Sequence, residues 1–583
     1  MRTAWWTWHA QLVHHCTHSA LRTLSPTTPH TTCRVVLFLG AAWYTGGNSS
    51  LFSNDKIMYD ILIKNGTVID GTGAPMTKKD IAIQDGVIAA IDDLSHEIAH
   101  EVYDATDRYI TPGFIDVNNH SDAYWKIFTN PTLDSLVHQG VTTIIGGNSG
   151  ASLAPLLTPD MIKGVRKWTD VSRVNVNWRT MQEFFDVVAS RKLTVNFGSL
   201  VGHSTLRRAL LHDEQRALTA DELDKVAQML DNALRDGALG LSTALLYAHA
   251  RSATREELVR LAQIVARYDG VYVAYLSDEM DGLLDALADV IAIAREAGVR
   301  LHIAHLKAVG KENWPLMHQA LTALNEAREE GLIVTSDVYP YTMMSAVLYT
   351  LLPQWVTDGG RTMMLARLKD PQTRAQVVDA MRDNPQIDLG EAIVSVSPIV
   401  KQLSRRKIAD IARAQEKSVE ETIIDLLLAS NGQAIVLLDA LGEDGVRAAL
   451  AQKNVMVASN GGGYAEKDWQ TGELIHPRSF GAFARLLGHY VRDEHVLSWE
   501  DAIHKITALP AQQFGLARRG QLAKGMIADI AIVDPATIAQ RATTEQPYRY
   551  ADGVTAVLIG GLFVLRDGVI TPQHAEIVRP VRV

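Results

Sequence analysis

The chain of 583 residues is too long for a single hydrophobic core, so we expect one domain of barrel size with smaller additions. Apolar residues make up 47% of it, and 56 basic side chains stand against 66 acidic ones with a pI near 6.1, as in an ordinary soluble globular protein. This balance excludes a strongly basic nucleic-acid-binding protein. The longest apolar candidate, VVLFLGAAWY at 35–44, is too short to span a membrane, which takes roughly 18 residues.

The first 57 residues differ from everything that follows. They hold both cysteines, Cys16 and Cys33, and five of the twenty histidines, and regular patterning begins only at Met58. We interpret residues 1–57 as a disordered or mistranslated leader, with a targeting segment and a metal-binding His/Cys tail as alternatives. The remaining chain has no cysteine and therefore no disulfide framework, which fits a cytoplasmic location.

Residues 58–111 consist of short apolar runs broken by Gly and Asp-Gly turns, among them DILIKNGTVID and DIAIQDGVIAAIDD. Residues 516–583 repeat that style in GQLAKGMIADIAIVDP and AVLIGGLFVLRDGVI. Short strands at regular spacing are typical of a β-sandwich. We therefore predict one small β-sandwich domain built from both of these segments.

Between them, short apolar segments alternate with amphipathic helical ones, a pattern that predicts the α/β class and a parallel (β/α)8 barrel of the TIM type. We place barrel strands 1–7 within 112–341 and the completion of the barrel within 454–515. Residues 342–453 are too long for a plain connection and are predicted as a helical insertion after the seventh strand. The predicted barrel strands lie near 114–119, 142–147, 195–202, 238–243, 271–276, 300–306, 332–339 and 454–459.

In such barrels the working residues follow the carboxyl ends of the strands. The first strand runs into PGFIDVNNHSD, where a His-X-His pair would place two imidazoles on one side of the chain, because strand side chains alternate faces. Here Asn118 takes the first position, and only His120 offers an imidazole to a metal. Polar residues follow the other predicted strands too: Asn148, Ser149, His203, Ser242, Thr243, Tyr275, Asp278, Glu279, His305, Lys307, Asp337, Tyr339, Ser459 and Asn460.

From Tyr59 to the C-terminus the sequence resembles the N-acyl-D-amino-acid deacylases (D-aminoacylases) of the amidohydrolase superfamily. The landmarks are DILIKNGTVIDGTG, TPGFIDV, QGVTTIIGGNSG, LVGHSTLR, EAGVRLHIAHLK, SDVYPYT, HPRSFGAFARLLGHY and GQLAKGMIADIAIVDP. The resemblance implies a barrel joined to a small β-sandwich. It also implies a hydrolase whose zinc-activated water attacks a non-peptide C–N bond, the amide of a small N-acylated D-amino acid.

Most positions of the implied metal centre are changed. Where the family has His, Cys, His and an aspartate that binds metal and serves as general base, this chain has Asn118, Ser149, Tyr275 and Asn460. The metal-ligand candidates that remain are His120 and His305. Two imidazoles among neutral groups hold zinc weakly, so we expect weak or absent zinc and no tightly bound cofactor.

The positions that the resemblance assigns to the substrate carboxylate are intact. They are Lys307, Tyr339, Ser345 and Arg478. A guanidinium fork with an ammonium group is the expected cradle for a carboxylate, so we expect a small-molecule carboxylate as the partner. The alternative is that Lys307 and Arg478 pair with acidic side chains at the rim of the barrel.

Three functions stay open. The first is the one that the family implies, hydrolysis of N-acyl amino acids or related C–N bonds, with His120, Tyr275 and Asn460 as the catalytic-site candidates. The second is a metal-free lyase or isomerase that uses His120, His305, Tyr275 or Lys307 as acid and base on a carboxylate substrate. The third is a non-catalytic homologue, a pseudoenzyme that binds a ligand and lost the metal centre by drift.

Overall fold

The computed structural model describes residues 58–158, 162, 175–212, 214–383, 387–396, 401–572 and 575–580. The described residues belong to one compact unit, Lys56–Val583. The leader predicted for residues 1–57 lies outside the described residues. Parallel strands alternate with helices through most of the unit, which confirms the predicted α/β class.

All eight predicted barrel segments contain a parallel strand, with bounds that differ by a few residues. One parallel sheet has the order β10-β9-β8, and a second has the order β11-β12-β13-β14-β15-β19. A parallel bridge between Asn119, after β8, and Gly461, after β19, links the first strand of one sheet to the last of the other. The bounds are β8 (Phe114–Asp116), β9 (Val141–Gly146), β10 (Asn196–Ser199), β11 (Val201–Gly202), β12 (Gly240–Ala244), β13 (Val271–Tyr275), β14 (Arg300–Ile303), β15 (Val334–Val338) and β19 (Val455–Val457).

Amphipathic helices lie between these strands. The helix α5 begins at a capping box of Thr219 and Glu222, and it buries Leu223, Val226 and Leu230 on one face. The helix α8 ends at Gly298, whose φ of 66° is the left-handed conformation that a glycine helix stop requires. The bounds are α3 (Met181–Ser190), α4 (His203–Leu211), α5 (Ala220–Arg235), α6 (Ala248–Arg251), α7 (Arg255–Arg267), α8 (Leu283–Ala297), α9 (Leu316–Glu329), α15 (Glu443–Ala451), α16 (Arg478–Arg485), α17 (Trp499–Ile506) and α18 (Ala508–Gln513).

Strands from both predicted β segments share one sheet and one core. In the seven-stranded sheet β23-β22-β21-β20-β7-β2-β3, β7 pairs antiparallel with β20, and the other sheet has the order β5-β4-β1-β6. Ile61 and Ile83 of one sheet lie in the same buried cluster as Ile530 and Leu558 of the other. The bounds are β1 (Met58–Lys64), β2 (Thr67–Val68), β3 (Thr77–Lys78), β4 (Asp80–Gln84), β5 (Val87–Asp92), β6 (Ile98–Asp104), β7 (Tyr109–Pro112), β20 (Ile530–Val533), β21 (Val554–Ile559), β22 (Leu562–Arg566) and β23 (Val569–Ile570).

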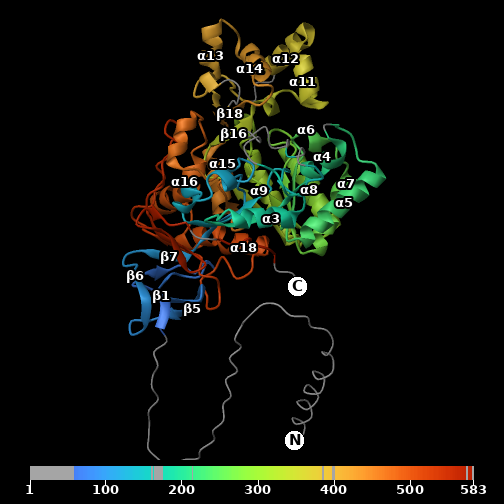
Figure 1. Ribbon diagram of the computed structural model, residues 1–583. Helices are drawn as coiled ribbons and strands as arrows, with labels where there is room; N and C mark the ends of the chain where they lie inside the picture. Colours follow the sequence, from blue (N-terminus) through green and yellow to red (C-terminus); the bar gives the residue numbers. More distant parts are fainter. Residues whose placement is uncertain are drawn as a thin grey trace, which may run out of the picture. The chain divides into compact units, whose positions relative to one another are not determined.

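The segment after β15 carries an antiparallel sheet of order β16-β18-β17 and the helices α11–α14, which Figure 1 shows grouped together in yellow and orange. The run 407–430 forms two helices, because Glu416 adopts a left-handed φ of 54° and Ser418 caps a new start. The next helix, α15, packs on α9, β15 and β19. The bounds are β16 (Met343–Val347), α10 (Gln354–Thr357), α11 (Gly360–Lys369), α12 (Pro371–Asp383), β17 (Ile393–Val396), α13 (Ile408–Gln415), α14 (Val419–Ala429) and β18 (Ile435–Asp439).

In the part of the chain that the structure describes, no helix is long and apolar enough to cross a lipid bilayer.

Candidate functional site

The predicted site residues stand at the carboxyl ends of the parallel strands. Tyr275 is the last residue of β13, while His305 and Asn460 lie just beyond β14 and β19. Three of the positions that the resemblance assigns to the metal centre have left-handed backbone: φ is 54° at Ser149, 40° at His305 and 45° at Asn460. Such backbone costs of order 1 kcal/mol or more at a non-glycine residue and clusters at functional sites.

His120 and Asn460 form one half of the site. The imidazole Nε2 of His120 lies 2.7 Å from Oδ1 of Asn460 and donates to that amide oxygen. Burial lowers the pKa of His120 to about 4, since the bond to Asn460 only partly offsets the loss of solvent. His120 is therefore neutral near pH 7, and its Nε2 carries the proton.

Asn118 joins a second buried group through Asp337. Its Nδ2 lies 3.4 Å from Oδ1 of Asp337, and His302 Nε2 lies 3.0 Å from the other carboxylate oxygen. Burial opposes the charge on Asp337, but the bond and charge of His302 outweigh it and hold the pKa of Asp337 below its usual value. The oxygen Oδ1 of Asn118 is buried and has no hydrogen-bond partner among the described residues.

Lys307 forms an ion pair with an acidic side chain, which was the alternative interpretation of the sequence. The pair is buried, however, and does not lie at a rim of the barrel. Its Nζ forms an ion pair with Oε1 of Glu279 and lies 2.9 Å from Nδ1 of His305. Lys307 and Glu279 are each only 7% exposed. The ring of Tyr275 meets His305 edge-on, with the centroids 4.2 Å apart. Lys307, Glu279, His305 and Tyr275 thus form one buried cluster, in which burial lowers the pKa of Lys307.

Arg478 is buried, and no carboxylate of the described residues forms an ion pair with it. It is 5% exposed, and its Nε and Nη1 have no hydrogen-bond partner among the described residues. Its guanidinium carbon lies 4.7 Å from the ring centroid of Tyr339. His476 fixes the start of α16 beneath it, since Nδ1 of His476 accepts from the backbone N–H of Arg478 and Nε2 donates to the carbonyl of Met343. Two nitrogens of the Arg478 guanidinium, with three N–H bonds between them, are therefore available to an acceptor that the described residues do not supply.

Two other candidates do not join these groups. Ser345 lies in β16 opposite Leu437, and among the described residues it makes no hydrogen bond with Lys307, Tyr339 or Arg478. His203 starts α4 and contacts Oε1 of Glu257 at 2.7 Å, and both side chains are buried in a structural ion-pair cluster.

Several residues of the site had no predicted role. Glu279 and Asp337 are recognisable in the sequence as polar residues after strands, but their partners are not. His302 is a polar residue inside the buried strand β14, a signal that the sequence offers on its own. His476 carries no signal beyond its place in HPRSFGAFARLLGHY.

The residues present do not fit the zinc centre that the resemblance implies. Zinc is held by three or four imidazole, thiolate or carboxylate groups. Here Nε2 of His120 is bound to Asn460, and the Nδ1 of His305 faces the ammonium of Lys307. Among the described residues, the one group of three potential ligand side chains with ligand atoms within 4.8 Å is Glu443, His489 and Glu494, away from the strand ends and paired with Arg447.

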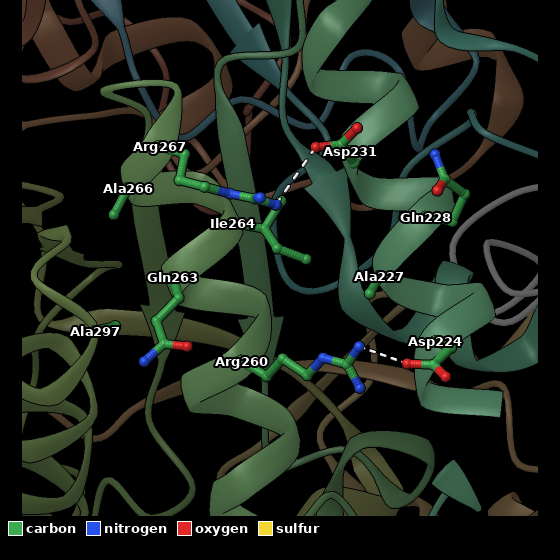
Figure 2. A pocket seen from close by; sticks show the side chains of 10 residues that line it. All are labelled: Asp224, Ala227, Gln228, Asp231, Arg260, Gln263, Ile264, Ala266, Arg267 and Ala297. Carbon is green, nitrogen blue, oxygen red and sulfur yellow. Dashed lines mark hydrogen bonds and ion pairs between the residues drawn. The ribbon is translucent and has the colours of Figure 1, made fainter. Parts of the chain in front are cut away.

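A cavity of about 950 Å³ lies elsewhere, along the outer helices α5 and α7 (Figure 2). Its charged groups already pair with each other, Arg260 with Asp224 and Arg267 with Asp231. None of its lining residues follows a parallel strand. We therefore assign the candidate site to the strand ends and not to this cavity.

Comparison with known proteins agrees with the sequence resemblance. A model of the amidohydrolase family matches residues 101–565. The chain is 32% identical to the D-aminoacylase of Alcaligenes xylosoxydans xylosoxydans over 90% of this chain and 98% of that one, and 31% identical to the N-acyl-D-glutamate deacylase of the same organism over 90% and 96%. The crystal structure of N-acyl-D-glutamate deacylase from Bordetella bronchiseptica, complexed with zinc and a phosphonate inhibitor, superposes with a TM-score of 0.76 at 30% identity, covering 90% of this chain and 100% of that one. This chain belongs to the amidohydrolase family and resembles its D-aminoacylases.

Proposed function

We propose that this protein binds a small carboxylate substrate of the N-acyl amino acid type and acts on its non-peptide C–N bond, as its relatives do, with most metal ligands replaced. The observation that carries the proposal is Arg478, a buried guanidinium whose Nε and Nη1 have no hydrogen-bond partner among the described residues. A planar fork of this kind matches a carboxylate. Tyr339 packs against its face and fixes its direction.

The proposal includes the architecture that brings these residues together. Two observations support closure into one (β/α)8 barrel: the sequential order of the parallel strands and the bridge between Asn119 and Gly461. In the proposed architecture the seven-stranded sheet, in which β7 pairs with β20, and the sheet β5-β4-β1-β6 form the β-sandwich, and residues 342–453 form the insertion. A closed barrel would have β8 beside β19, which agrees with the contact of His120 with Asn460 and with the effect of the Arg478 charge on His120.

Without a fitting zinc centre, the chemistry rests on the side chains themselves. His120 holds its proton on Nε2 beside Asn460, and Asn460 has no carboxylate with which to take a proton from water. Tyr275 stays protonated, because burial raises its pKa well above the usual value. These groups orient a bound substrate and donate to it, so hydrolysis would rely on a water held against the substrate and not on a metal-bound hydroxide.

A second candidate function follows from the cluster of Lys307, Glu279 and His305. A buried carboxylate, ammonium and imidazole within hydrogen-bond reach are the groups that a metal-free lyase or isomerase uses as acid and base. A non-catalytic carboxylate-binding protein is the third. The second and third functions also bind the carboxylate at Arg478. They differ from the hydrolase because the C–N bond of the bound acid is not hydrolysed.

The binding part is tested by thermal denaturation with N-acetyl-D-amino acids and a panel of small acids. A ligand at a hundred times its dissociation constant stabilises the fold by roughly 2.7 kcal/mol. We expect such a shift in the unaltered protein and its loss in Arg478→Ala. An unchanged shift in Arg478→Ala would show that the acid binds elsewhere.

The reaction is tested by assaying release of the free amino group from the acids that bind, with and without a chelator. Turnover that is insensitive to the chelator supports hydrolysis by the side chains alone. Chelator-sensitive turnover would overturn the proposed replacement of the metal. Binding without release of an amine would favour the lyase, isomerase or non-catalytic function.

A further inference from the structure

Tyr247 and Tyr275 present aromatic surface within the candidate site. Tyr275 ends β13, and Tyr247 follows β12 directly before α6. Their rings meet at 81° with centroids 5.7 Å apart, the edge-to-face geometry that aromatic pairs prefer. Both residues are half-buried, so each keeps some exposed surface. We call this pair the tyrosine wall.

The tyrosine wall adjoins the buried cluster of Lys307, Glu279 and His305, because Tyr275 belongs to both. The ring of Tyr275 stands at 89° to that of His305, and the ammonium of Lys307 lies 5.2 Å from the Tyr275 ring centroid. The wall therefore adjoins both the imidazole of His305 and the ammonium of Lys307.

The tyrosine wall occupies a position that bears on which substrate the site can bind. Tyr275 stands where the resemblance implies a metal ligand, so aromatic surface takes a position that would otherwise face the metal. If Tyr275 had replaced a metal ligand by random drift, any residue that fills the space would serve. Here the new residue instead forms ordered ring contacts with both Tyr247 and His305 and stays partly open.

We propose that the substrate carries an aromatic acyl group on its nitrogen, an aroyl or arylacetyl unit, which lies against Tyr247 and Tyr275 while its carboxylate binds Arg478. This inference rests on the proposed function and adds the substrate class. An aromatic ring gains edge-to-face contacts with the wall that a saturated ring of the same size does not make. The ammonium of Lys307 beside the Tyr275 ring adds a cation that favours a π-system over an aliphatic group.

The experiment compares three acids that share one carboxylate and differ in the acyl group: N-acetyl-, N-benzoyl- and N-cyclohexanecarbonyl-D-alanine. Dissociation constants are measured by calorimetric titration of the full chain. We expect N-benzoyl-D-alanine to bind at least about fivefold more tightly than the cyclohexane analogue, and both to bind more tightly than N-acetyl-D-alanine. Equal or weaker binding of the benzoyl compound would overturn the aromatic inference.

Variants of Tyr247 test whether the tyrosine wall causes the preference for the benzoyl compound. Tyr247→Ala removes one ring and is expected to abolish the benzoyl preference, while Tyr247→Phe keeps the ring and most of the preference. Tyr268→Ala is the matched control, since Tyr268 lies at the end of α7 with its hydroxyl on Asp231, outside the strand ends. A preference that survives Tyr247→Ala in folded protein would show that the wall does not contact the acyl group.

Arg478→Ala separates this inference from the proposed function. If all three acids bind through Arg478 but with equal affinity, the carboxylate site stands and the aromatic inference fails. If none of the acids binds, or if Arg478→Ala leaves their affinities unchanged, the proposed function fails and the inference fails with it.

Discussion

Nε2 of His120 donates to Oδ1 of Asn460 across 2.7 Å, and the two residues are 340 positions apart in the chain. The bond uses the imidazole nitrogen of one retained metal-ligand candidate and the side chain that replaces the aspartate of the family. The other retained imidazole, His305, contacts the ammonium of Lys307 at 2.9 Å. Each of the two remaining imidazoles therefore already contacts another side chain of the protein through one ring nitrogen.

The first prediction concerns zinc. Because these two imidazoles cannot replace the missing Cys, His and Asp, we expect well under one zinc per chain after dialysis against a chelator, measured by elemental analysis. Combining Asn118→His, Ser149→Cys, Tyr275→His and Asn460→Asp restores the ligand types and is expected to raise the content toward one zinc per chain. A full equivalent of zinc in the unaltered protein would contradict the prediction.

The second prediction distinguishes the geometry of Arg478 from its charge. Arg478→Lys keeps a cation but loses the planar fork, so it should weaken carboxylate binding substantially, and Arg478→Ala should weaken it further, by about 2 to 5 kcal/mol. Either change removes the contact with Tyr339, so the free energy of unfolding should fall by at most about 2 kcal/mol. Titration and chemical denaturation of both variants measure these effects. A loss of several kcal/mol in stability, with no acid bound by the unaltered protein, would make Arg478 a structural residue.

The parallel strands were predictable because buried parallel strands appear in sequence as short apolar runs between glycines and polar turns. β13, for example, is VYVAY, preceded by Gly270 and followed by polar residues. The break between α13 and α14 was not predictable from such a pattern. Glutamate at position 416 is a good helix former, but here it is the exposed residue that ends α13 at a φ of 54°, where the backbone N–H of Lys417 donates to the carbonyl of Ala412.

The site was predictable in position but not in its pairings. Topology alone brings residues that follow parallel strands to one face, so His120, His305, Lys307 and Asn460 were recognisable as candidates. The sequence did not specify whether Lys307 faces a ligand or an acid, because that depends on the side-chain conformation of Glu279, 28 residues away. Arg478 likewise differs from a surface arginine only through its burial.

The third prediction concerns the buried cluster of Glu257, Arg207 and His203. Arg207 Nη1 lies 2.5 Å from Oε2 of Glu257, and both side chains are 1% exposed. Glu257→Gln removes the negative charge of the buried carboxylate that Arg207 contacts and should lower the free energy of unfolding by about 3 to 5 kcal/mol in chemical denaturation. Glu296→Gln is the matched control, because Glu296 and Arg255 form an ion pair in which both side chains are 53% exposed, and its effect should stay below about 1 kcal/mol. Equal effects of the two changes would show that the buried pair contributes no more than the exposed one.

The last prediction is a pH dependence that originates far from the site, at Lys505 in α17. This ammonium is 2% exposed and donates to the backbone carbonyls of Gln452 and Val455. Burial lowers the pKa of Lys505 from 10.5 to about 8. Between these two values the unfolded chain binds a proton that the folded chain has released. The free energy of unfolding attributable to Lys505 therefore rises as the pH rises through this window, and the protonated form disfavours folding below it.

From pH 8 to pH 9.5 this contribution should amount to about 1.5 kcal/mol. Chemical denaturation at both pH values is compared between the unaltered protein and Lys505→Met, which has a similar length and no charge. Other groups, including the buried tyrosines, titrate equally in both proteins and cancel in the difference. We expect the unaltered protein to gain stability relative to Lys505→Met across this range, whatever the absolute stability of the variant. Parallel pH profiles would mean that Lys505 keeps its charge in the fold, stabilised by the carbonyls of Gln452 and Val455 more strongly than burial destabilises it.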